Sequence, residues 1–180
     1  LTKAVSEQRH RSFAPIYDPE TRLLILGSLP GARSLAASQY YAHPQNQFWR
    51  LLGGVMGHDL AASDYSRRLA LLRQYHIGLW DVIESAARRS SLDSDIKEAA
   101  PQDLLGLIAA LPNLRAVGFN GGKAAQLGRR ILAGKGEAAR GPSRPDLHLI
   151  DLPSSSAANT RSFASKAEAW AALAPYVGGA

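Results

Sequence analysis

Residues able to activate water or to hold an anionic ligand are concentrated in three segments of the chain. These segments are residues 27–46, 120–123 and 153–159, and Asp81 stands apart from them near the end of an expected strand. A carboxamide such as that of Asn46 can orient a water molecule through its oxygen, and a carboxylate such as Asp81 can accept a proton from it. The amides of paired glycines and the hydroxyls of consecutive serines suit phosphates or the polar edge of a ring. The pattern indicates hydrolysis or binding of an anionic ligand.

The composition excludes several other catalytic centres. The chain has no cysteine, so it can form no disulfide framework, thiolate zinc site, iron–sulfur cluster or cysteine nucleophile. Its five histidines show no close ligand spacing, and no Walker-type Lys-Ser/Thr follows a glycine turn. A Gly-x-Ser-x-Gly turn of a serine hydrolase is also missing. We expect no metal and no cofactor.

The charge balance favours a polyanionic partner. Lysine and arginine number 21 against 15 acidic residues, which gives a formal net charge of +6 and a sequence pI near 9.9. Residues 123–144 hold six basic side chains and a single acid, Glu137. The basic side chains are Lys123, Arg129, Arg130, Lys135, Arg140 and Arg144. A solvated helix and loop is the alternative interpretation of this run.

Strands alternate with helices along the chain. We expect strands over residues 22–27, 77–82, 114–119 and 147–152. We expect helices over residues 45–56, 63–75, 101–111 with Pro101 in the first turn, 123–132, and 165–174 with a Ser165–Glu168 capping box. Residues 90–99 are polar and are expected to form a loop. This order predicts a three-layer α/β/α sandwich with a central, mostly parallel four-stranded sheet, in one domain spanning residues 1–180.

The expected sheet positions the reactive residues. In parallel sheets, ligands bind outside the carboxyl ends of the strands, where the connecting loops meet. All three segments follow expected strands. The longest apolar runs, such as residues 23–29, are far shorter than the roughly 20 residues of a membrane span, and no signal peptide is recognisable after Leu1. We expect a cytoplasmic monomer with no membrane association.

The loop sequences are more specific than the topology. Residues 27–31 (Gly-Ser-Leu-Pro-Gly) and 41–49 (Tyr-Ala-His-Pro-Gln-Asn-Gln-Phe-Trp) resemble the first motif region of the uracil-DNA glycosylase superfamily, particularly its mismatch-specific branch. The length between the two blocks also matches that branch. Residues 153–156 (Pro-Ser-Ser-Ser) resemble the second motif, a loop that presses on the DNA backbone beside a flipped nucleotide.

Two departures indicate which branch this chain resembles. Leu29 stands where uracil-specific members carry a water-positioning Asp or Asn, and Leu152 stands where several members carry a His that stabilises charge on uracil. Residues 78–82, 91–94 and 118–121 are instead similar to the hypoxanthine-DNA (deoxyinosine) glycosylase branch. In that branch the catalytic role belongs to the Asn of the His-Pro-x-Asn block.

The resemblance implies a role for each residue. Catalysis falls to Asn46, with Asp81 as the competing candidate. Base binding is expected of Tyr41, His43, Asn120, Gly27 and Ser28. Contacts to the DNA backbone are expected of Pro30, Gly31, Ser154, Ser155 and Ser156. The charge of the basic run adds Lys123, Arg129 and Arg130 to these expected contacts.

Each role has a structural alternative. Tyr41 is then a core residue, His43 and Asn46 stabilise a helix N-terminus, Asn120 caps a helix and Asp81 ends a strand in solvent.

The resemblance implies a monofunctional DNA glycosylase acting on DNA that contains a deaminated base. Hypoxanthine is the favoured base, and an abasic site is the product. Excision of uracil or mismatched bases is the alternative within the same chemistry. A damaged-DNA-binding protein without catalytic activity is the alternative from another class.

Overall fold

Four parallel strands form the centre of the protein. The structure is a computed structural model that describes residues 9–87, 90–134 and 144–178. The central strands are β2 (Leu23–Gly27), β3 (Ile77–Asp81), β6 (Ala116–Asn120) and β7 (His148–Leu152), in the spatial order β3-β2-β6-β7. The predicted four-stranded parallel sheet is confirmed.

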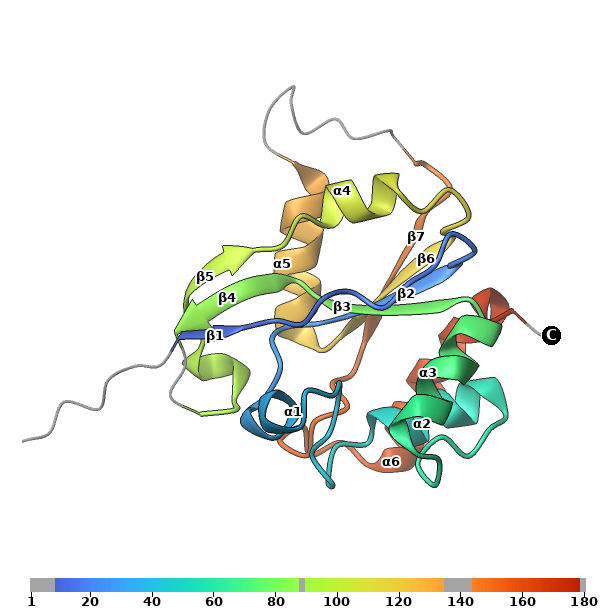
Figure 1. Cartoon of the computed structure of the whole chain (residues 1–180), viewed down its shortest axis with the longest axis horizontal. Helices are drawn as coiled ribbons and strands as arrows, with labels where there is room; N and C mark the ends of the chain where they lie inside the picture. Colours follow the sequence, from blue (N-terminus) through green and yellow to red (C-terminus); the bar gives the residue numbers. More distant parts are fainter. Residues whose placement is uncertain (1–8, 88–89, 135–143, 179–180) are drawn as a thin grey trace, which may run out of the picture.

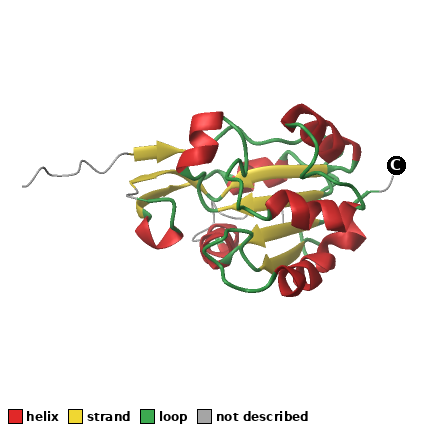
Figure 2. Ribbon diagram, turned by 90° about the horizontal axis from the view of Figure 1, so that it is seen from below, coloured by secondary structure: helices red, strands yellow, loops and turns green. Residues whose placement is uncertain are grey.

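Both faces of this sheet are covered, because alternate residues of a strand point to opposite faces. In β2, Leu23 and Ile25 belong to one hydrophobic core, while Leu24 and Leu26 belong to the other. The first core contains residues of α2 (Phe48–Met56), α3 (Tyr65–Gln74) and α6 (Phe163–Trp170), and the second contains residues of α4 (Leu104–Ala109) and α5 (Gly122–Ala133). Figure 1 shows the two groups of helices on opposite sides of the strands, and Figure 2 shows the strands of the sheet lying side by side with helices over them. The predicted α/β/α sandwich is therefore confirmed.

A second, antiparallel sheet extends from one edge of the sandwich (Figure 1). It consists of β1 (Arg9–Arg11), β4 (Ile83–Ala87) and β5 (Lys97–Pro101), in the order β1-β4-β5. The loop predicted over residues 90–99 is therefore wrong for residues 97–99. β5 is an exposed edge strand that is held by backbone hydrogen bonds to β4 and not by buried side chains. Its sequence therefore shows no alternation of apolar and polar residues.

Several helix ends differ from the prediction. Pro101 ends β5, and α4 begins at Leu104, where the Asp103 side chain accepts a hydrogen bond from the Gly106 amide. The α6 cap is Ser162, whose hydroxyl accepts from the Ser165 amide, so the predicted Ser165–Glu168 capping box is wrong. Each segment contains more than one residue that could cap the helix N-terminus. The backbone geometry of the folded chain decides which of them does so.

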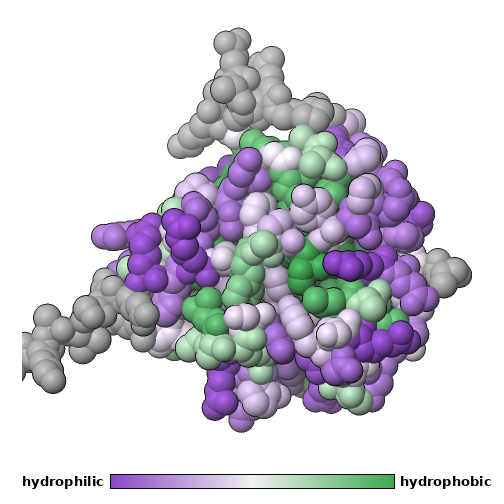
Figure 3. Space-filling view, viewed as in Figure 1, coloured by the Kyte–Doolittle hydropathy of each residue, from purple (hydrophilic) through white to green (hydrophobic). Residues whose placement is uncertain are grey.

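The remaining elements are short. They are α1 (Ala32–Ala37) and two 3-10 helices, η1 (Asp93–Asp95) and η3 (Ala171–Tyr176). Among the described residues, none of the helices combines the length and apolar character needed to cross a bilayer. On the face shown in Figure 3, hydrophobic residues reach the surface in separate patches among hydrophilic ones.

Candidate active site

A cleft of about 480 Å³ opens at the carboxyl ends of β2, β3 and β6. Its lining includes residues from 27–31, 40–46, 91–93 and 154–159. Every predicted site residue contributes to this lining except Lys123, Arg129 and Arg130. The sequence motifs therefore converge where the parallel topology predicts a ligand site.

Gly27 allows two cleft side chains to approach the end of β2. It is paired in register with Asp81 of β3. A Cβ atom on Gly27 would lie 2.7 Å from Asp81 Oδ1 and 2.9 Å from the Tyr41 hydroxyl. Asp81 is 4% exposed, and its Oδ2 accepts a 2.7 Å hydrogen bond from Ser12 Oγ. Asp81 is thus a buried carboxylate in the cleft and not the solvent-exposed strand end of the alternative interpretation.

Tyr41 joins the cleft to the aromatic core. Its ring stacks on Phe48 with 3.7 Å between centroids and 8° between planes, and its edge meets Trp49. Its backbone adopts a φ of 53°, a region that side chains rarely occupy. Burial, together with the nearby Asp81 carboxylate, raises the pKa of Tyr41. Its neighbour Tyr40 is 4% exposed and donates its hydroxyl to the Ala14 carbonyl.

Asn46 has one half of its carboxamide engaged by the backbone. Its Oδ1 accepts a 3.0 Å hydrogen bond from the Phe48 amide, at the start of α2. Its Nδ2 makes no hydrogen bond within the described ranges, so two N–H donors remain for a ligand. His43 is exposed, and its Nδ1 accepts from the Gln45 amide, which leaves Nε2 to donate to a ligand. Both residues therefore combine a structural contact with free donors at the cleft.

The serine loop, residues 153–156, is held from inside the fold. Ser155 exchanges two hydrogen bonds with the Asn120 side chain, and its carbonyl accepts from the Gln47 amide. Ser154 Oγ accepts from the Ser156 amide, and Ser156 Oγ accepts from the Ala158 amide. Because these two hydroxyls act as acceptors, their own protons remain available to donate to an anion.

Helix α6 supports both ends of the serine loop. Trp170 Nε1 donates to the Pro153 carbonyl at 3.0 Å, and Lys166 Nζ donates to the Ser156 carbonyl at 3.2 Å. The two residues are four positions apart and so share one helix face. Burial lowers the pKa of Lys166. Sequence reasoning missed this support, whose only signal is a lysine one turn before a tryptophan.

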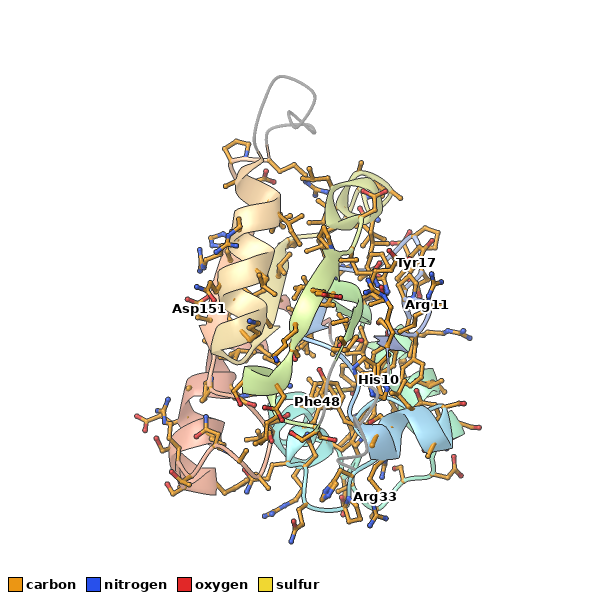
Figure 4. All side chains as sticks on the ribbon, turned by 90° about the vertical axis from the view of Figure 1, so that its left-hand side faces the viewer. His10, Arg11, Tyr17, Arg33, Phe48 and Asp151 are labelled. Atoms are coloured by element: carbon orange, nitrogen blue, oxygen red, sulfur yellow. The ribbon has the colours of Figure 1, made fainter. Side chains whose placement is uncertain are left out.

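Residues 91–93 form a wall of the cleft that the site prediction omitted. Ser91 Oγ accepts from the Ala32 amide, and Ser28 Oγ donates to Asp93 Oδ1. Asp93 is therefore a second carboxylate of the cleft. The sequence analysis used residues 91–94 only to identify the branch and gave them no role, since Asp93 begins the short helix η1 between β4 and β5 and follows no strand of the central sheet. Arg33 of α1 also lines the cleft and is exposed at the surface (Figure 4).

Two arginines of the basic run, residues 123–144, are engaged by other groups of the protein. Arg129 forms a 3.0 Å ion pair with Asp151 and donates to the Leu149 carbonyl. Figure 4 shows Asp151 beside α5, on the opposite side of the view from Arg33. Arg144 donates to four backbone carbonyls around the end of α4. Lys135 and Arg140 lie outside the described residues.

Comparison with known proteins places this architecture in a family. The sequence model of the uracil DNA glycosylase superfamily matches residues 14–174. The chain belongs to this superfamily. The segments that resemble the superfamily motifs, around residues 27–46 and 154–156, are those that meet at the cleft.

Two curated relatives carry a more specific name. A Methanosarcina barkeri (strain Fusaro / DSM 804) protein named hypoxanthine DNA glycosylase is 40% identical over 163 residues, covering 91% of this chain and 96% of the relative. A protein of the same name from Methanosarcina acetivorans is 38% identical over the same length and coverage. A solution NMR structure of an M. acetivorans protein assigned to the uracil DNA glycosylases superimposes with a TM-score of 0.77, at 36% identity, over 92% of this chain and 96% of that one.

Proposed function

We propose that this superfamily member is a DNA glycosylase that hydrolyses the bond between deoxyribose and a deaminated base, with hypoxanthine as the favoured base. The observation that carries the proposal is the meeting of Asn46, Asp81 and the serine loop at one cleft of about 480 Å³. The name shared by the two curated relatives supports hypoxanthine as the base.

Two buried leucines support a purine over uracil. Leu29 is 6% exposed and Leu152 is 4% exposed, so both are packed apolar side chains. Neither can position water or donate to a uracil oxygen. Positioning of the water and hydrogen bonding to the base must therefore come from other cleft residues.

The proposed reaction is a hydrolysis at C1′ of the deoxyribose. The N9–C1′ bond breaks, its electron pair moves into the departing hypoxanthine, and positive charge develops on the sugar. The oxygen of a water molecule then bonds to C1′, and its proton passes to the Asp81 carboxylate or to the departing base. Asn46 Oδ1 retains a second lone pair that can orient this water, while Nδ2 can donate to the base.

The substrate nucleotide must leave the DNA stack to reach this cleft. The hydroxyls of Ser154 and Ser156 are suited to donate to the phosphates on either side of it. The Tyr41 ring can stack on the base, a contact worth about 1–3 kcal/mol. No lysine lines the described part of the cleft, so we expect no Schiff base and no strand cleavage by the enzyme.

The test is an alkaline-cleavage assay on end-labelled oligonucleotides containing hypoxanthine, uracil, xanthine or only normal bases. We expect strand breaks at hypoxanthine, and only after alkali. Asn46→Ala should lower the rate by about 10² or more, the usual effect of removing one group that stabilises the transition state. Asn113→Ala is the matched control, because Asn113 is exposed and lies outside the cleft.

Other outcomes contradict the proposal in different ways. Release of uracil alone would overturn the base assignment. Tight DNA binding with no base release would favour the damaged-DNA-binding alternative.

A further inference from the structure

Leu92 is a large apolar side chain exposed at the rim of the cleft. It is 49% exposed, and Tyr17 is the other large hydrophobic residue recorded as exposed in the described ranges. Leu92 contributes to the cleft lining and Tyr17 does not. A half-exposed leucine gives up part of the free energy that full burial would contribute.

The segment that carries Leu92 is fixed on both sides. The preceding residue, Ser91, accepts from the Ala32 amide, and the following residue, Asp93, accepts from Ser28. The Leu92 amide donates to Ser90 Oγ at 3.1 Å, and its carbonyl accepts from the Asp95 amide at 3.1 Å. These bonds tie the backbone around Leu92 to Ser28 and Ala32, while about half of the Leu92 side chain remains exposed.

A flipped nucleotide leaves a gap in the duplex. Proteins that distort DNA insert apolar side chains such as leucine between base steps, and a side chain of this kind fits such a gap. The loop proposed to contact the DNA backbone, residues 153–159, has Pro153, Ala157 and Ala158 as its apolar residues. Pro153 does not line the cleft, and the two alanines are too small to fill the space of a base. Leu29 also lines the cleft, but it is 6% exposed and packs in the core. Among the described lining residues, Leu92 alone is large, aliphatic and exposed.

We propose that Leu92 is the wedge that enters the duplex and occupies the space left by the extruded base. The inference rests on the proposed glycosylase function and extends it to duplex substrates. The wedge then comes from the segment of residues 91–93 and not from the serine loop.

The test compares Leu92→Ala with wild type on the same deoxyinosine oligonucleotide, single-stranded and paired. A single strand has no gap to fill. We therefore expect kcat/KM on the duplex to fall about tenfold or more, because the gap left by the base would stay unfilled. On the single strand the fall in kcat/KM should be clearly smaller than on the duplex, because no gap in a base stack has to be filled. Leu92→Met should retain duplex activity because it keeps an apolar side chain of similar volume. Tyr17→Ala is the control for loss of an exposed apolar residue.

A binding measurement addresses the wedge without depending on catalysis. In an Asn46→Ala background, 2-aminopurine paired with thymine, in the step beside the base opposite the lesion, should brighten on binding because the wedge unstacks it. Leu92→Ala should remove that increase. Equal losses on single strands and duplexes, or no loss on either, would overturn the wedge. If the wild type releases no base from any oligonucleotide, the proposed function fails, and the fluorescence change still decides the role of Leu92.

Discussion

Asn120 and Ser155 exchange two hydrogen bonds across 35 residues of sequence. The Ser155 amide donates to Asn120 Oδ1 at 2.8 Å, and Asn120 Nδ2 donates to Ser155 Oγ at 2.9 Å. Both residues are buried. The pair joins the end of β6 to the serine loop, so the position of the proposed phosphate contacts depends on a strand of the central sheet.

Removing this pair should lower stability as well as activity. Ser155→Ala loses one hydrogen bond, and we expect it to cost about 1 kcal/mol. Asn120→Ala leaves the Ser155 amide buried without its acceptor, and we expect about 2 kcal/mol or more. Urea unfolding measures both values. Because the residues share their bonds, the double variant should cost less than the sum, and strict additivity would contradict the coupling.

Gly121 and its neighbour Gly122 should respond oppositely to substitution by alanine. Gly121 has φ 103° and ψ 163°, a region that only glycine occupies readily, and an added Cβ would lie 3.1 Å from the Ser154 Cβ. We expect Gly121→Ala to destabilise the protein by about 1–3 kcal/mol. No atom lies within 4 Å of a Cβ on Gly122. Gly122→Ala should therefore be neutral or slightly stabilising, because Gly122 is the first residue of α5 and alanine favours the helix more than glycine does. Thermal unfolding of the two variants, compared with wild type, checks this contrast.

Alkaline pH should reveal the buried tyrosines. The raised pKa of Tyr41 means that its phenol keeps its proton in the folded protein at pH values where the unfolded chain has lost it. The contribution of Tyr41 to the free energy of unfolding is therefore fully present below pH 10.0, the ordinary pKa of tyrosine. It is lost as the pH rises from there toward the raised pKa of the folded protein. Tyr41→Phe should reduce this loss by up to about 1.4 kcal/mol per pH unit. Unfolding free energies measured from neutral to alkaline pH test this, and an equal difference between the two proteins at every pH would contradict it.

Salt dependence should separate cations that contact DNA from cations engaged by the protein. Arg33 is exposed, lines the cleft and makes no hydrogen bond within the described ranges. Affinity for DNA falls as the salt concentration rises, and Arg33→Gln should make the plot of log affinity against log salt concentration less steep by about 0.9, the contribution of one phosphate contact. Arg129→Gln should change it less, because this guanidinium is paired with Asp151. Lys123→Gln and Arg130→Gln test the remaining predicted contacts. Equal slopes for the Arg33 and Arg129 variants would contradict this division.

The sequence alone was sufficient to determine the central sheet and most of the cleft. Buried parallel strands appear as short aliphatic runs such as residues 23–26, because both faces of each strand are covered. Their topology brings the following loops to one edge, so Asn46, Asp81 and the serine loop could be assigned to one site before any contact was known.

Contacts between distant segments were decided only by the tertiary structure. Residues 91–93 became a cleft wall through bonds from Ser28 and Ala32, some 60 residues away in the chain. Arg129 was a candidate DNA contact by charge, yet folding paired it with Asp151. Likewise, only packing revealed that Lys166 supports the serine loop. Burial patterns and turn residues can be read from a short stretch of sequence. The hydrogen-bond partner of a polar side chain depends instead on which distant segments come together when the two hydrophobic cores form.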